Sequence, residues 1–183
     1  MTGLAMLAEQ IGVSERTLRR AVNEGTLRAV RPTPRTLEMS LAERDYARRK
    51  WSLLSTLRAT LRTEPNVRLA SLFGSIAADR DTAESDVDVL VDLSDDSLDR
   101  VIDLTLKLEE ALGKTVDLVR LAEAESEPLL LARALESGRV LVVRDRRWPS
   151  LCRRVPGLLR FGLAEKDRRA RAALDSIDRL LAA

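Results

Sequence analysis

Residues 1–39 contain two short runs of apolar residues at helical spacing, separated by a glycine. The first run stops at Gly12, and Ser14 then supplies a residue type that caps helix N-termini. The second run ends near Gly25. The apolar positions are Leu4, Leu7, Ala8 and Ile11 in the first run and Leu18, Ala21 and Val22 in the second. Two helices joined by so short a turn predict a helix-turn-helix unit, whose second helix can enter the major groove of DNA.

The second predicted helix also has a polar face. Helical geometry turns this face away from the apolar side, so its members are candidate DNA contacts: Arg16, Arg19, Arg20 and Asn23. A solvated helix face is the alternative reading of the same residues. Residues 26–35 are short, basic and interrupted by prolines, which predicts a turn or small wing against phosphates. Residues 40–62 predict a long helix that Ser40 caps and that links this head to the rest of the chain.

The middle of the chain alternates strand and helix patterns. Strand patterns cover residues 67–73, 85–93, 115–119 and 139–143, and amphipathic helices cover 97–112 and 128–137. Gly113 follows the first of these helices, whereas Pro128 begins the second and Gly138 follows it. The resulting order, β-β-α-β-α-β, predicts an α/β sheet domain.

A last helical pattern covers residues 156–182. Its apolar stripe consists of Leu163, Ala170, Leu174, Ile177 and Leu181, which we expect to pack on the protein itself. An arginine cluster on the same helix suits either solvent or an acidic partner, and its members are Arg168, Arg169 and Arg171. The chain thus divides into a head (1–39), a linker helix (40–64), a core (65–147) and a helical tail (148–183).

The amino-acid composition excludes several kinds of catalytic and metal site. No apolar run approaches the roughly 20 residues of a membrane span, and no signal-peptide pattern opens the chain. The single cysteine, Cys152, excludes an internal disulfide, so we expect a cytoplasmic protein. The sequence has no histidine, which excludes histidine acid–base catalysis and histidine metal ligands. Any metal must therefore sit on carboxylates, which favours Mg²⁺ or Mn²⁺ over zinc.

The net charge of +2 conceals a segregation of charge along the chain. Residues 1–64 hold 12 Lys/Arg against 7 Asp/Glu, a net charge of +5. Residues 65–147 hold 11 against 18, a net charge of −7, and residues 148–183 hold 8 against 4, a net charge of +4. A basic head, an acidic core and a basic tail indicate separate tasks for the three segments.

The acidic core contains the strongest chemical pattern. Gly74 and Ser75 follow the first strand pattern, and ten residues later Asp86 and Asp88 flank Val87. Alternation in a strand turns the valines to the core and places both aspartates on the opposite face. Two carboxylates so close repel each other, and a divalent cation that binds both removes the conflict.

Asp117 is the first candidate for a third carboxylate, since it lies in the next strand pattern. Three carboxylates on adjacent strands can hold two ions that clamp an in-line displacement at phosphorus. Gly74 permits a sharp turn and a close phosphate, and Ser75 can cap a short helix and offer its hydroxyl and N–H. Aspartates at strand ends are also common turn formers, and Asp117 alone could face solvent.

Taken together, Gly74-Ser75, Asp86-x-Asp88 and the later Asp117 resemble the polymerase-β-type nucleotidyltransferase superfamily. Over about residues 65–145 the chain most resembles the minimal nucleotidyltransferases (MNT) that accompany HEPN toxins in bacterial toxin–antitoxin pairs. The resemblance implies a polymerase-β-like core with a mixed sheet. The head resembles MerR- or excisionase-like helix-turn-helix modules.

The resemblance also implies an activity: transfer of a nucleoside monophosphate, usually AMP from ATP with Mg²⁺, to a hydroxyl group. In HEPN pairs the acceptor is a tyrosine of the toxin, which the modification silences. By position, Gly74 and Ser75 would hold the triphosphate and Asp86 and Asp88 would bind metal. Asp117 would be the third ligand and help to deprotonate the acceptor.

The chain departs from the family pattern after the Gly-Ser pair. Many members read Gly-Ser-x-Ala-Arg-Gly, whereas this chain has Ala78 and Asp79 in the last two places. Arg80 is the candidate to replace the missing arginine at the nucleotide. We expect an antitoxin-like enzyme that labels a toxin and binds its own promoter. The alternatives are an inactive fold that senses nucleotide or blocks a toxin, and an enzyme acting on RNA or a small molecule; a homo-oligomer also stays open.

Overall fold

The computed structural model describes residues 3–33, 36–145 and 147–181, with side chains as far as Leu174. Its head contains α1 (Gly3–Gln10) and α2 (Glu15–Asn23), joined by a turn in which Gly12 has a φ of 70°. The Ser14 hydroxyl accepts a hydrogen bond from the Thr17 backbone N–H at 3.1 Å. The predicted N-cap of the second helix is therefore present.

A short strand-like pairing follows the head. The backbones of Val30 and Glu38 exchange two hydrogen bonds of 2.9 Å and form an isolated antiparallel bridge. The predicted wing (26–35) contributes one side of this bridge, and its positions 34 and 35 lie outside the described residues. The linker helix is α3 (Leu41–Thr63), and the Ser40 hydroxyl caps it by accepting the Glu43 N–H at 3.1 Å.

The described part of the core contains a mixed sheet in the order β3-β2-β1-β4. Its central strand β1 is antiparallel to β2 and β4, whereas β2 and β3 run parallel. The strands are β1 (Val67–Leu72), β2 (Val87–Leu93), β3 (Val116–Arg120) and β4 (Arg139–Val143). The helices around them are α4 (Gly74–Ala77), α5 (Leu98–Leu112), α6 (Leu121–Ser126), α7 (Pro128–Ser137) and α8 (Arg147–Leu181). The predicted β-β-α-β-α-β order is confirmed, with the short α4 and α6 in addition.

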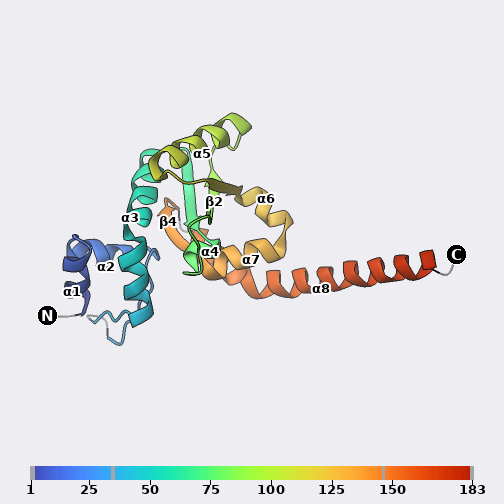
Figure 1. Ribbon diagram of the computed structural model, residues 1–183, viewed down its shortest axis with the longest axis horizontal. Helices are drawn as coiled ribbons and strands as arrows, with labels where there is room; N and C mark the ends of the chain where they lie inside the picture. Colours follow the sequence, from blue (N-terminus) through green and yellow to red (C-terminus); the bar gives the residue numbers. More distant parts are fainter. Residues whose placement is uncertain (1–2, 34–35, 146, 182–183) are drawn as a thin grey trace.

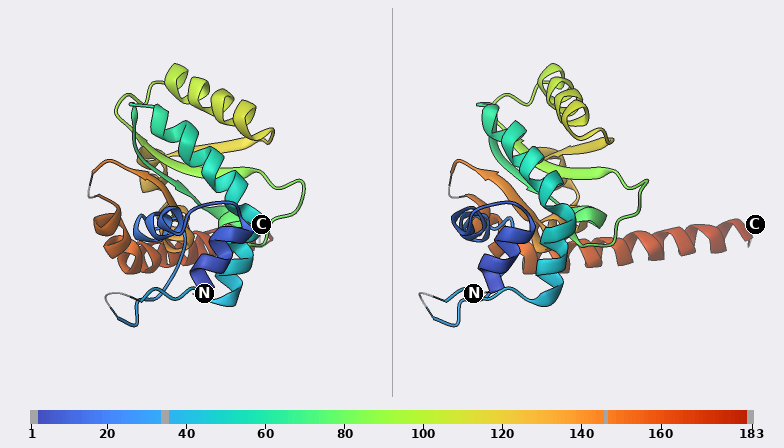
Figure 2. Two further views of the ribbon diagram at one scale, coloured as in Figure 1. Left: turned by 90° about the vertical axis from the view of Figure 1, so that its left-hand side faces the viewer. Right: turned by 60° about the vertical axis from the view of Figure 1, so that its left-hand side comes forward.

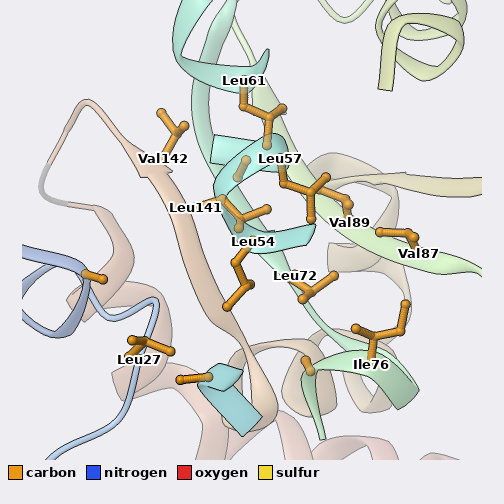
Figure 3. Packing of buried hydrophobic residues seen from close by; sticks show 14 of the residues in the cluster. Leu27, Leu54, Leu57, Leu61, Leu72, Ile76, Val87, Val89, Leu141 and Val142 are labelled. Carbon is orange, nitrogen blue, oxygen red and sulfur yellow. The ribbon is translucent and has the colours of Figure 1, made fainter. Parts of the chain in front are cut away.

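Each face of the sheet packs against its own helices (Figure 1). On one face, Val87 and Val89 of β2 belong to an apolar cluster that includes Leu54 and Leu57 of α3 (Figure 3). On the other face, Leu90 belongs to a cluster formed with α6, α7 and the start of α8. The predicted inward direction of the β2 valines is confirmed, since Val87, Val89 and Val91 are fully buried. Asp88 shares its face with Leu90, as period-two alternation requires.

The head and the core share apolar packing. Leu7 and Leu18 of the head belong to the same cluster of buried residues as Leu54 of α3 and Leu72 of β1. The backbone adds a link, because the Val140 N–H of β4 donates to the Gly25 carbonyl at 3.1 Å. The head is thus held against the edge strand of the sheet.

The last helix, α8, differs from the prediction in two respects. It begins at Arg147 rather than at residue 156, so Pro156 lies inside the helix. The first turns form because Trp148 and Leu151 pack into the second apolar cluster. The C-terminal half then projects away from the core (Figure 2), and Leu163 and Leu174 are 53% and 62% exposed. Ala170 is exposed as well, so the expected self-packing is wrong at all three described positions of the stripe. Residue 182 and the side chains of Ile177 and Leu181 lie outside the described part.

Among the described residues, no helix is both long enough and apolar enough to cross a lipid bilayer.

Candidate active site

The predicted site residues of the core meet at one end of the sheet. Gly74 begins α4 directly after β1, and Asp88 is the second residue of β2. The Phe73 N–H donates to the Asp88 carbonyl at 2.9 Å, which holds these two segments together. Asp88 and Asp117 are partners in the parallel pairing of β2 and β3. Asp86 lies just before β2 rather than inside it, so the predicted strand from residue 85 begins two residues too early.

The approach of the backbone to Asp88 requires a glycine at position 74. Gly74 has a φ of 72°, a conformation that L side chains rarely adopt. A Cβ added to it would overlap the carboxylate of Asp88. The Gly-Ser pair therefore brings the start of α4 directly against the acidic strand.

Ser75 lies inside the first turn of α4, and Phe73 occupies the N-cap position without a side-chain hydrogen bond. The prediction that Ser75 caps this helix is therefore wrong. Its backbone N–H instead lies near the Asp88 side chain and acts to lower the pKa of that carboxyl. The first N–H groups of a helix have no partner inside the helix, so Asp88 occupies a place that an anion can take.

Asp88 is the carboxyl group of the site whose ionised form is disfavoured. Burial raises the pKa of its carboxyl above the ordinary value, and the charges of Asp117 and Asp86 raise it further. The backbone N–H of Ser75 acts in the opposite direction and lowers this pKa. Asp86 and Asp117 are exposed to solvent, whereas Asp88 is half-buried. A cation shared by these carboxylates would offset their repulsion.

The residue types fit a hard cation, because three carboxylates are the donors that Mg²⁺ and Mn²⁺ prefer. In the described part of the chain, however, no three such side chains are gathered closely enough to form a finished metal centre. The structure shows that Asp117 on β3 and Asp86, just before β2, both repel the charge of Asp88. The carboxylates are thus near each other without converging on one point.

The segment between the two motifs is tied to the linker helix. Asp79 pairs with Arg49, and Asp81 pairs with Lys50 at 2.5 Å in a largely buried contact. Asp79 stands where the family pattern has its second glycine, and its φ is 58°. Asp tolerates this left-handed conformation better than most residues. The departure from the pattern therefore keeps the backbone shape and adds an ion pair.

Arg80 is exposed, and its backbone N–H donates to the Ser75 carbonyl at 2.9 Å. This hydrogen bond holds the backbone of Arg80 against the first turn of α4. The backbone is therefore fixed near the Gly-Ser pair, while the guanidinium extends from an exposed position.

A buried ion pair behind α4 was missed by the sequence analysis. Arg139 and Glu43 are 3% and 7% exposed and pair at 2.5 Å. The Arg139 guanidinium also donates to the Ala77 carbonyl of α4 at 2.9 Å and stacks over the Tyr46 ring, 3.5 Å from its centroid. A charged residue within the apolar strand pattern of residues 139–143 was the one available signal. The pair joins the linker helix, the edge strand and the end of α4.

The head residues proposed for DNA contact do not form one open row. Arg19 pairs with Glu15 of its own helix at 2.6 Å, and Asn23 accepts a hydrogen bond from Arg31. Arg16 and Arg20 line a cavity between α2 and α3. The structure therefore separates Arg19 from Arg16 and Arg20.

A mixed sheet that carries a Gly-Ser turn and paired aspartates at one end is the arrangement of a nucleotidyltransferase. The chain belongs to the family described as Polymerase beta, Nucleotidyltransferase, which matches residues 55–147. This match leaves out α1, α2, the first half of α3 and almost all of α8. A comparison with curated protein sequences gave no match.

Solved structures share the fold. A toxin–antitoxin structure with AMP-PNP is 25% identical with a TM-score of 0.54, over 68% of this chain and 97% of that chain. A mutant of the toxin–antitoxin MntA-HpeT is 26% identical with a TM-score of 0.53, over 67% and 95% of the two chains. A second MntA-HpeT mutant, at 23% identity and a TM-score of 0.54, shows the likeness of fold alone.

Proposed function

We propose that this protein is an antitoxin-like enzyme that transfers AMP from ATP to a hydroxyl group of a HEPN-type toxin. The observation that carries the proposal is the contact of Gly74 with Asp88 at a sheet end that also holds Asp86 and Asp117. Membership of the nucleotidyltransferase family supports the reaction class. Similarity to a toxin–antitoxin structure with AMP-PNP supports both the nucleotide and the kind of partner.

Each site residue has a role in this proposal. Gly74 lets the triphosphate approach the backbone, and the N–H and hydroxyl of Ser75 donate to phosphate oxygens. Asp86, Asp88 and Asp117 hold Mg²⁺ or Mn²⁺, which supplies charge neutralisation at the triphosphate when bound. The exposed guanidinium of Arg80 reaches the phosphates from the adjoining segment.

Asp117 also has a place in the transfer step, because it is exposed to solvent and is the register partner of Asp88 on the neighbouring strand. Its carboxylate takes the proton of the acceptor hydroxyl, and the acceptor oxygen forms a bond to the α-phosphorus. The bond from the α-phosphorus to its bridging oxygen breaks, and pyrophosphate leaves. A proton acceptor within hydrogen-bond reach typically contributes about 10²–10⁴-fold to such a step.

The test follows label from α-labelled ATP, with Mg²⁺ present, to a HEPN-type protein encoded beside this chain. The wild type labels the toxin, whereas Asp86→Asn and Asp88→Asn lower the rate by about 10²-fold or more. Asp99→Asn is the matched control, since Asp99 is an exposed residue of α5 away from the site. Labelling by Asp88→Asn at the wild-type rate would overturn the proposal. Label on RNA with none on protein would replace the acceptor by an RNA end.

The proposal includes DNA binding by the head at the promoter of its own operon. A capped α2, the bridge at Val30 and the net charge of +5 in residues 1–64 support it. Fluorescence anisotropy with the promoter duplex measures it. Arg19→Ala should weaken binding, and Arg160→Ala on α8 is the charge-matched control. Equal affinity of both variants for promoter and random duplexes would contradict specific recognition.

A further inference from the structure

A basic cavity of about 290 Å³ lies between α2 of the head and α3 of the linker helix. Four arginines line it, two from each helix: Arg16 and Arg20, and Arg58 and Arg62. The indole of Trp51 forms part of the same wall. None of these five residues belongs to the site at the sheet end.

The cavity has an excess of positive charge. The carboxylate of Glu24 accepts hydrogen bonds from Arg20 and Arg62 at 2.7 Å each and also from Arg58. Arg16 has no ion pair within the described residues. Three guanidinium groups share one carboxylate and the fourth has none, which leaves three positive charges around the cavity.

One charge of this excess, that of Arg58, is buried. Arg58 is only 6% exposed, and burial lowers its pKa, as do the charges of Arg62 and Arg20. Arg16, Arg20 and Arg62 are exposed, so water screens much of the repulsion among them, whereas the charge of Arg58 is screened less. An anion in the cavity would remove this repulsion.

The N-terminal end of α2 adds to the positive electrostatic potential of the cavity. Ser14 and Thr17, at the N-cap and in the first turn, line the cavity beside Arg16. The N-terminus of a helix carries a partial positive charge and unpaired N–H groups. The helix end, the arginines and the hydroxyls thus favour the same kind of ligand.

We propose that this cavity binds the phosphate of a nucleotide, taken either from a free nucleotide or from a nucleic-acid backbone. The planar guanidinium fork matches phosphate oxygens in pairs, and several arginines suit a multiply charged ligand. The Trp51 indole offers an aromatic surface beside the phosphate site on which a base can stack. Because one wall belongs to the head and the other to α3, the bound phosphate holds the two helices together.

Calorimetry with the full chain tests the proposal, using ATP in one arm and a short DNA duplex in the other. Both arms contain EDTA, which removes the divalent ion that the proposed catalytic site requires. Arg16→Ala and Arg62→Ala should each weaken binding by about tenfold or more, since each loses a charge-assisted contact. Arg48→Ala is the control, because Arg48 is an exposed arginine of α3 outside the cavity.

Binding of ATP that Arg16→Ala weakens and Arg48→Ala does not would establish a free-nucleotide site. The same pattern with duplex alone would establish a backbone-phosphate site. Absence of binding in both arms, or an equal effect of Arg16→Ala and Arg48→Ala, would overturn the proposal. Thermal unfolding of each variant shows whether it is folded, and Arg16→Ala breaks no ion pair within the described residues.

Discussion

Replacement of Gly74 by alanine separates backbone strain from the contact with Asp88. Gly74 has a φ of 72°, and its added Cβ would overlap the Asp88 carboxylate. Gly113 is a control within the same core: its φ is 63°, and an added Cβ meets nothing within 4 Å. The two substitutions therefore share the strain and differ in the overlap.

The magnitudes follow from these two geometries. A left-handed conformation costs a residue with a Cβ about 1–2 kcal/mol, which is the whole expected cost of Gly113→Ala. In Gly74→Ala the Asp88 carboxylate must also move to make room for the added Cβ. Such overpacking typically costs about 1–3 kcal/mol, so the total should be about 2–5 kcal/mol.

Urea unfolding measures the free energy of unfolding of both variants, and the labelling assay measures transfer. Gly74→Ala should lower the transfer rate by about 10²-fold, because a displacement of about 1 Å at a reacting group has that effect. Gly113→Ala should transfer at the wild-type rate. The reasoning is refuted if the two variants lose equal stability, or if Gly74→Ala transfers as fast as Gly113→Ala.

Three further substitutions test the electrostatics. In EDTA, the raised pKa of Asp88 means that the folded state holds this proton more tightly, so the contribution of Asp88 to wild-type stability falls as pH rises above about 3.8. Asp88→Asn lacks this fall, and its stability relative to wild type should grow between about pH 4 and pH 7; urea unfolding that shows a constant difference would contradict this. Glu43→Gln leaves Arg139 buried without a counter-charge and should lower the free energy of unfolding by about 3–5 kcal/mol in the same assay. A decrease of less than about 1 kcal/mol would contradict this expectation. Tyr46→Phe removes a buried hydroxyl that has no hydrogen-bond partner among the described residues, so the denaturation midpoint should rise by the equivalent of about 1 kcal/mol rather than fall.

Local patterns predicted the secondary structure well. The start of α3 was predicted because the Ser40 hydroxyl caps the helix through a hydrogen bond from a backbone N–H of the next turn. Both partners of this hydrogen bond are close in sequence. The burial of Val87 and Val89 followed from alternation alone. The start of α8 was not predictable in this way, because its first turns depend on the packing of Trp148 and Leu151 in the second cluster.

The residues of the candidate site could be predicted from the sequence, but their arrangement in space could be predicted only in part. The spacing of Gly74, Ser75, Asp86 and Asp88 indicated both a phosphate turn and a carboxylate pair. It did not show that Ser75 lies inside α4, with its backbone N–H near the Asp88 side chain. The direction of an N–H group depends on where the helix begins, and that start is decided by the packing of α4 on β2.

The sequence by itself determined most of the elements, the core-facing positions of β2 and the types of residue at the proposed catalytic site. These depend on interactions between residues a few positions apart, where the chain has few alternatives. The tertiary structure alone decided which distant charges meet: Glu43 with Arg139, Asp81 with Lys50, and Arg16 with the α3 arginines. The partners in such pairs are separated by tens of residues. The local sequence pattern around an arginine on a helix face is the same whether that arginine faces solvent or a cavity. Only the packing of α2 and β4 against α3 distinguishes these cases.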